Sequence, residues 1–219
     1  MHFIVCLSKG LSAIDRAVTA DLMPSAATIG FIPNAGDPFD DPCFVDQSRQ
    51  RLHQLGHHIV TLDVSVLDAS AMSVALEAVD AVFVADGNVF SLLDQLKRRD
   101  LDQVIAERVR GGMPYFGEGA GAMLAYRDIS LAAGVDDASA APDLTDTTGL
   151  GLIDFFPLPH ANRDGYRERA DAVYEQYRSE HQIVRFADNE AIIATSGFRD
   201  DVAYRRTIVG SVSASVETA

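Results

Sequence analysis

Short apolar segments alternate with longer segments of helical periodicity through the first half of the chain, and this alternation constrains the fold more than any other feature. The apolar segments are typical of buried strands, and they are His2–Leu7, Ala27–Ile32, His58–Leu62, Ala81–Val84 and Pro114–Phe116. The intervening segments carry apolar residues at helical spacing, and they are Phe44–Leu55, Ala69–Ala78, Val89–Leu96 and Leu101–Gly111. Such alternation predicts an α/β three-layer sandwich, in which a mostly parallel central sheet has helices on both faces.

The second half of the chain follows this alternation less regularly. Residues 128–148 are rich in Ala, Asp, Ser and Gly, and they predict a long loop with little order of its own. The apolar run Gly151–Leu158 leads into another loop, and Tyr166–Ser179 predicts a charged helix. Two further apolar runs flank the polar residues 188–190, and this arrangement predicts a β-hairpin.

The composition favours one soluble domain and excludes several classes of partner. We expect residues 1–209 to form a single α/β domain and the small, polar residues 210–219 to form a frayed tail. The net charge of −14 argues against binding to nucleic acid, because no basic surface is available to contact phosphates. No apolar run approaches the roughly 18 residues of a membrane span, and no basic segment precedes the first strand, so we expect no membrane association and a cytoplasmic location. Cys6 and Cys43 lack metal-like spacing, and we expect neither a disulfide nor a metal or cofactor.

A glycine-rich turn, GEGAG at residues 117–121, follows the strand that ends at Phe116. A strand, glycines at this spacing and a following helix are the layout of a nucleophile elbow, Gly-x-Ser-x-Gly, in which a strained turn presents the serine to a cleft. The N–H group of the next residue then points at the oxyanion that develops during acyl transfer. Gly119 stands where the serine would be. On spacing alone, an ordinary glycine-rich turn between a strand and a helix is the more frequent explanation.

A second polar segment, Asp86-Gly87-Asn88, directly follows the strand that ends at Val84. Backbone N–H groups at the start of a helix can bind an anion, which is the functional interpretation of this segment. Asn88 is equally suited to cap the following helix, which is the structural interpretation.

His160 forms a third candidate position, because it follows an apolar strand and lies in a loop. A histidine in this setting is a candidate general base, although isolated histidines are more often structural. Asp136 and Asp137 lie in the predicted loop between the elbow and His160, where an acid that orients the base would be needed. Aspartates in loops are usually just solvated, so these two remain candidates.

Four segments, in the same order along the chain, resemble the dipeptidase E (aspartyl dipeptidase) family, serine peptidases related to cyanophycinase. They are FIPNAGDPFDDPCFVDQSRQRLHQLG, DAVFVADGNVFSLLDQL, GGMPYFGEGAGA and GLGLIDFFPLPHANRDG. The second resembles the family's GGGNTFxLL segment, with Ala85 and Asp86 in place of two glycines and Val89 in place of threonine. The third resembles its PYxGxSAGA elbow. The resemblance extends over residues 28–204 and implies a fold like that of class I glutamine amidotransferases, which is flavodoxin-like.

The resemblance implies a role for each matching position. It places the nucleophile at Gly119, the base at His160, and the acid of the triad at Asp136 or Asp137. The N–H groups that would bind the oxyanion belong to Gly87 and Ala120, and Asn88 lies beside them in the substrate-binding segment. Substrates of the family are small peptides with an N-terminal Asp, whose side-chain carboxylate a basic residue should contact. The candidates for this contact are Arg167 first, then Arg163 and Arg169. Nothing in the sequence excludes a homodimer.

Glycine at position 119 is the departure from the family pattern that matters most. Because glycine has no side chain to attack a carbonyl, the family mechanism cannot run at this position, and peptidase activity should be absent or strongly impaired. Three hypotheses stay open: a serine dipeptidase in which serine was replaced by design, a natural pseudoenzyme that binds small acidic peptides or amino acids, and a hydrolase that activates water with His160 and either Glu118 or an aspartate. Glu118 itself should point away from the cleft. Restoring serine at position 119 tests for an inactivated site.

Overall fold

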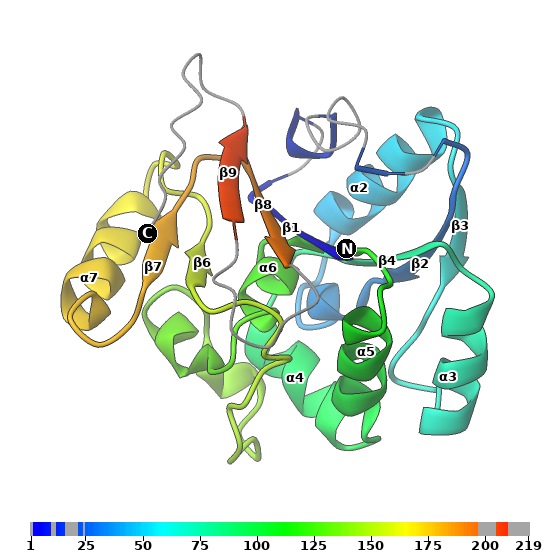
Figure 1. The fold of residues 1–219 in the computed structure, drawn as a ribbon. Helices are drawn as coiled ribbons and strands as arrows, with labels where there is room; N and C mark the ends of the chain where they lie inside the picture. The colour runs from blue at the N-terminus through cyan, green and yellow to red at the C-terminus, as the bar shows by residue number, and fades with distance from the viewer. Residues whose placement is uncertain (1, 10–11, 16–21, 24, 197–204, 210–219) are drawn as a thin grey trace.

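The computed structural model describes residues 2–9, 12–15, 22–23, 25–196 and 205–209. Its centre is a seven-stranded sheet, which Figure 1 shows with helices packed around it. The strand order is β3-β2-β4-β5-β1-β8-β9. The strands are β1 (His2–Leu7), β2 (Thr28–Ile32), β3 (His58–Thr61), β4 (Ala81–Val84), β5 (Tyr115–Glu118), β8 (Ala191–Ser196) and β9 (Arg205–Val209). The first five run parallel, whereas β8 and β9 are antiparallel to their neighbours. This confirms the predicted mostly parallel sheet.

Helices cover both faces of this sheet. They are α2 (Cys43–Gln54), α3 (Ala69–Glu77), α4 (Val89–Lys97), α5 (Leu101–Arg110), α6 (Ala120–Leu124) and α7 (Arg167–Tyr177). Because side chains alternate along a strand, β1 contributes to two hydrophobic cores: Ile4 and Cys6 join the core that contains α3, α4 and α5, while Val5 and Leu7 join the core that contains α2. The two cores confirm the three-layer α/β architecture. No helix among the described residues combines the length and apolarity needed to cross a bilayer.

The segment predicted as a long loop, residues 128–148, is ordered by its own aspartates. It contains two 3-10 helices, η2 (Ile129–Gly134) and η3 (Ala138–Ala140), and its ends pair in an isolated bridge. The side chains of Asp128 and Asp137 accept hydrogen bonds from the N–H groups two residues later, and these bonds start the two helices. The prediction of little local order was therefore wrong. Short 3-10 helices that are held by side-chain caps do not need a regular spacing of apolar residues, so the sequence pattern did not indicate them.

The hairpin predicted around residues 188–190 is also absent. Instead, β7 (Ile183–Arg185) pairs with β6 (Phe156–Leu158) in a separate two-stranded parallel sheet, while β8 pairs with β1. The strands on the two sides of this turn were predicted correctly as strands, but each has a different partner because β1 offers β8 an open edge in the buried sheet. The predicted tail, residues 210–219, lies outside the described residues.

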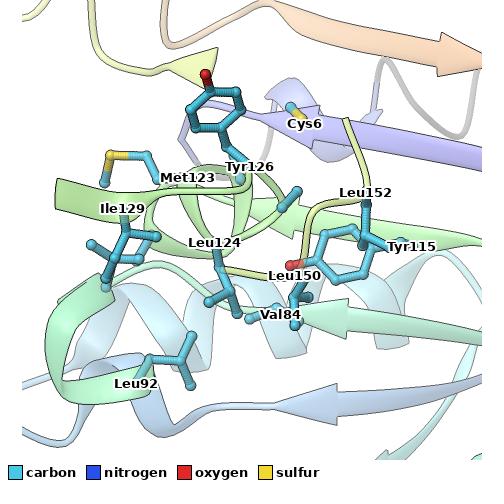
Figure 2. Close-up of a cluster of buried hydrophobic side chains, with 14 of the residues drawn as sticks. Cys6, Val84, Leu92, Tyr115, Met123, Leu124, Tyr126, Ile129, Leu150 and Leu152 are labelled. Carbon is cyan, nitrogen blue, oxygen red and sulfur yellow. The ribbon is translucent and has the colours of Figure 1, made fainter. Parts of the chain in front are cut away.

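A compact group of apolar side chains supports the turn between β5 and α6 (Figure 2). Val84 of β4, Tyr115 of β5 and Leu124 of α6 lie in this group together with Leu150 and Leu152 (Figure 2), and all five are at most 3% exposed. The Tyr115 hydroxyl donates a 2.7 Å hydrogen bond to the carbonyl oxygen of Gly121. The turn that carries residue 119 is therefore packed against buried side chains from the sheet, from α6 and from the segment around Leu150 and Leu152.

His57 is a buried histidine outside the cavity, and it allows the effect of burial on the pH dependence of stability to be measured. Its side chain is 4% exposed, neither ring nitrogen has a hydrogen-bond partner among the described residues, and burial lowers its pKa. A histidine with a lowered folded-state pKa costs stability as the pH falls through its ordinary value near 6.5, because only the unfolded chain is readily protonated. We therefore expect His57→Leu to raise the free energy of unfolding by about 1 kcal/mol at pH 5, and by less at pH 8.

Urea denaturation at both pH values measures this effect. The matched control is His58→Leu, because His58 is the exposed neighbour of His57. An equal gain at pH 5 and pH 8 would show that protonation of His57 is not the cause.

Candidate active site

A cavity of about 520 Å³ opens at the carboxyl ends of β4 and β5. Its walls include eight of the positions singled out from the sequence, namely Asp86, Gly87, Asn88, Asp136, Asp137, His160, Arg163 and Arg169. Ligands of open α/β sheets bind at this edge, because loops from several strands converge there. Three of the four chain segments that resembled one family therefore line a single cavity, whereas the elbow segment, residues 111–122, contributes none of its lining residues.

A tight glycine-rich turn joins β5 to α6, at the place where the sequence predicted an elbow. Gly119 links β5 to α6 with φ 50° and ψ −106°, a conformation that favours glycine. At Gly117 and Gly121 a Cβ atom would overlap the backbone of Gly121 and Val84, respectively, so both flanking positions require glycine. The glycine-rich turn predicted between a strand and a helix is therefore present, and its three glycines stand where the backbone requires or favours glycine. Glu118 is buried and accepts a 2.7 Å hydrogen bond from Ser48 on α2, so it points away from the cavity as expected.

The carboxylate of Asp86 occupies the space that a side chain at position 119 would need. Its Oδ1 accepts hydrogen bonds from the N–H groups of Gly87 at 2.8 Å and of Ala120 at 3.0 Å. A Cβ atom built on Gly119 would overlap this carboxylate. The two N–H groups expected to bind an oxyanion therefore converge on one point, and a carboxylate oxygen of the chain itself already lies there. Nothing in the sequence pattern suggested this role for Asp86.

His160 lies between two carboxylates. Its Nδ1 is 2.6 Å from Oδ1 of Asp188, and its Nε2 is 3.6 Å from Oδ2 of Asp86. The Ser8 hydroxyl donates to Asp188 at 3.0 Å and accepts a bond from the His160 N–H group at 2.8 Å, which holds the pair in place. His160 itself adopts a positive φ of 60°. Asp188 thus orients the imidazole ring through Nδ1, while Nε2 on the other side of the ring faces Asp86.

The two carboxylates keep the imidazole of His160 charged. Burial alone would lower the pKa of His160, but the hydrogen bonds to Asp188 and Asp86 outweigh it and raise that pKa to about 9. In the opposite direction, the pKa of Asp188 is lowered, because its bond to His160 outweighs the effect of burial. At neutral pH the imidazole is therefore protonated, and it cannot accept a proton while both carboxylates are charged.

Asp136 and Asp137, the acids proposed from the sequence, make other contacts. Oδ2 of Asp136 accepts a 2.8 Å bond from the N–H group of Val89 at the start of α4. Asp137 caps η3, and its carbonyl oxygen accepts a 2.8 Å bond from the side chain of Asn88. The carboxylate bonded to Nδ1 of His160 is Asp188, from the turn between β7 and β8. The available signal was a polar residue in the short turn between two apolar runs, but the apolar pattern around that turn indicated a hairpin and not part of the site.

The remaining predicted residues divide between helix caps and the cavity wall. Asn88 caps α4, since its Oδ1 accepts a 2.9 Å bond from the N–H group of Ser91. Arg167 donates to the carbonyl oxygen of Asn162 and lies outside the cavity wall, whereas Arg163 and Arg169, the two alternatives, line it. Among the described residues, no cluster of three or more His, Cys, Asp or Glu side chains is arranged to hold a metal ion.

Asp136 should make stability depend on pH. Burial raises its pKa to about 7, although the Val89 N–H group opposes the shift. A carboxyl group whose folded-state pKa is raised destabilises the fold as the pH rises from about 4 through 7, because the unfolded chain releases the proton more readily. We expect the melting temperature to fall less between pH 5 and pH 8 in Asp136→Asn than in the unmodified protein. Thermal denaturation monitored by circular dichroism measures this difference.

Asp137→Asn is the matched control, because hydrogen bonds to Ser139 lower the pKa of Asp137 and it stays ionised throughout this range. The same pH dependence in Asp136→Asn as in the unmodified protein would contradict the assignment.

Comparison with known proteins identifies the family and supports the fold. The model of peptidase family S51 matches residues 7–199 of the chain. An uncharacterized peptidase of Listeria monocytogenes, Lmo0363, is 32% identical over 165 residues, which cover 75% of this chain and 80% of the relative. Peptidase E of Streptomyces coelicolor is 34% identical over 139 residues, covering 63% of this chain and 53% of that protein. The crystal structure of a candidate peptidase E protein from L. monocytogenes superposes with a TM-score of 0.82 and 27% identity, covering 96% of this chain and 99% of the other.

Proposed function

Because the chain belongs to peptidase family S51, we propose that it is a peptidase E-like protein whose cleft binds small acidic peptides or amino acids without serine-type cleavage. The fold and the family membership predicted from the sequence are confirmed by the comparisons. The proposal concerns what this particular cleft does, since its elbow carries Gly119.

One observation carries the proposal: Oδ1 of Asp86 accepts both of the N–H groups that would otherwise stabilise an oxyanion. A peptide carbonyl that entered the cleft would find these donors already satisfied, and no hydroxyl is available at position 119 to attack it. Stabilisation of the oxyanion is usually the largest single contribution to acyl transfer. Both requirements of the serine mechanism are therefore unmet at the same point.

The charged side chains around the cavity favour a small ligand that carries both a positive and a negative charge. Arg163 and Lys9 line the cavity and can pair with carboxylates, while Asp86 and Asp136 can pair with an ammonium group. An amino acid or short peptide with an acidic side chain presents both groups. The cavity volume of about 520 Å³ is within the range of small-molecule sites.

Isothermal titration calorimetry with Asp-Leu tests this function directly. We expect binding without release of leucine, and binding about tenfold weaker in Arg163→Gln, because a charge-assisted hydrogen bond is lost. Arg167→Gln is the matched control, since Arg167 lies nearby but outside the cavity wall and should leave the affinity unchanged. Absence of binding to Asp-Leu and to aspartate, or rapid cleavage of Asp-Leu by the unmodified protein, would overturn the proposal.

A further inference from the structure

The two oxygens of the Asp86 carboxylate have different surroundings. Oδ1 accepts two backbone hydrogen bonds, from Gly87 and Ala120. Oδ2 accepts neither of these bonds, and it lies 3.6 Å from Nε2 of His160. The side chain is 17% exposed, and Asp86 lines the cavity. One oxygen is therefore held in the position of an oxyanion, while the other lies beside a histidine, in a side chain that lines the cavity.

We propose that Asp86 is itself a nucleophile, which attacks a saturated carbon of a small alkyl electrophile and forms an ester that His160 then hydrolyses. The activity uses the same cavity as the proposed function and goes beyond it, since it makes the chain a hydrolase of another class. Asp86 is the catalytic nucleophile, His160 the general base and Asp188 the residue that positions His160.

The geometry selects a saturated carbon and excludes a peptide carbonyl. Attack on an amide would need an empty oxyanion site, which Oδ1 of Asp86 fills, and the intermediate would expel the carboxylate again in preference to an amine. Attack by Oδ2 on a saturated carbon develops no oxyanion. The carbon–halogen bond breaks as the carbon–oxygen bond forms, and the electron pair leaves with the halide.

The second step uses the geometry already present. Water gives a proton to Nε2 of His160 and attacks Cγ of the Asp86 ester, and the negative charge that develops on Oδ1 is stabilised by the two N–H groups that already contact it. When the intermediate collapses, the bond from Cγ to the alkyl-bearing oxygen breaks, and the alcohol leaves with the proton from His160. The sum is alkyl halide plus water giving alcohol, halide and one proton, with Asp86 regenerated as a carboxylate.

Formation of the ester would also prepare His160 to act as the base. In the free protein, Asp86 and Asp188 together raise the pKa of His160 to about 9. Esterification removes the charge of Asp86, whereas Asp188, Ser8 and the ring of Tyr166 keep their contacts with the imidazole. The pKa of His160 then falls, because burial opposes the charged form and one of its two anionic partners is gone. The base becomes available only after the ester has formed.

The walls of the cavity indicate which electrophiles fit. Arg163 and Lys9 supply positive charge for a carboxylate, and Phe44 and Met123 supply apolar surface for a short carbon chain. Burial and the charges of Asp136 and Asp86 raise the pKa of Tyr166, so its phenol stays protonated and can donate a hydrogen bond to the departing group. A short halogenated carboxylic acid meets these requirements.

Turnover of bromopropionate in heavy-oxygen water tests the proposal. We expect bromide release, and mass spectrometry of peptide fragments should find heavy oxygen in the side chain of Asp86, because water attacks Cγ and not the substrate carbon. In His160→Gln the ester should accumulate on Asp86 as a propionate adduct, and in Asp86→Asn bromide release should stop. His53→Gln, an exposed histidine on α2, is the matched control and should behave like the unmodified protein.

Circular dichroism checks that each variant is folded, and Asp188→Asn provides a second variant in which ester hydrolysis should slow and the adduct should accumulate. Absence of heavy oxygen at Asp86 together with absence of an adduct in His160→Gln and Asp188→Asn would overturn the proposal. So would bromide release that survives Asp86→Asn. Binding of Asp-Leu by calorimetry is independent of these results, so failure of the ester mechanism would be distinguishable from failure of the proposed function.

Discussion

Replacing Asp86 by glycine and Gly119 by serine together is expected to create hydrolysis of Asp-Leu at about 10³-fold the rate of Gly119→Ser alone. The double substitution supplies the missing nucleophile and at the same time frees the N–H groups of Gly87 and Ala120, to which Oδ1 of Asp86 is bonded. Loss of the Asp86 charge also lowers the pKa of His160, which returns the imidazole to the neutral form that a general base requires. Release of leucine, followed as kcat/KM, measures the gain.

Gly119→Ser alone should remain almost inactive, although serine at position 119 was the simplest test suggested by the sequence. Its Cβ would overlap the Asp86 carboxylate, and its backbone would adopt a positive φ of 50° that costs about 1–3 kcal/mol for a residue other than glycine. Asp86→Gly alone is the complementary control, because it empties the oxyanion site without supplying a nucleophile. If Gly119→Ser were as active as the double variant, Asp86 would have to leave the site freely, and its blocking role would be contradicted.

The fold was predictable because its determinants are local. The strands up to β5 and the helices between them are encoded by apolar periodicity, and the elbow by glycines at positions 117 and 121, where a side chain would overlap the backbone. Because each of these features depends on residues that are close together in the chain, a pattern of a few residues is enough to predict it.

The identities of the carboxylates in the site were not predictable by the same means. The departure at Asp86 was visible as an aspartate in place of a glycine, but its consequence depends on space left empty at Gly119, which only the folded chain brings beside it. Asp188 bonds to His160 from 28 residues away, in a turn whose flanking strands join two different sheets. Asp136 and Asp137 have the correct chemistry, and they are engaged instead in capping α4 and η3.

Asp188 is therefore expected to be the orienting acid of the reactivated site. In the Asp86→Gly/Gly119→Ser background, Asp188→Asn should lower kcat by roughly 10⁴-fold, the size of effect known for the equivalent change in a serine protease triad. The carboxylate holds Nδ1 of His160 at 2.6 Å and stabilises the imidazolium that forms when serine loses its proton, and a neutral amide cannot do so. Single-turnover kinetics with Asp-Leu separates this loss of chemistry from any change in binding.

The Asp137→Asn substitution in the same background distinguishes the two assignments of the acid. Asp137 caps η3, and kcat should stay within about threefold of its value in the double variant, since a capping contact contributes stability and not chemistry. Proton titration of His160 by NMR adds a readout that structural damage alone would not produce: Asp188→Asn in the unmodified protein should lower its pKa from about 9, because one of two anionic partners is neutralised. A large loss of kcat in Asp137→Asn, with little change in Asp188→Asn, would show that Asp137, one of the two acids implied by the resemblance, is the orienting acid.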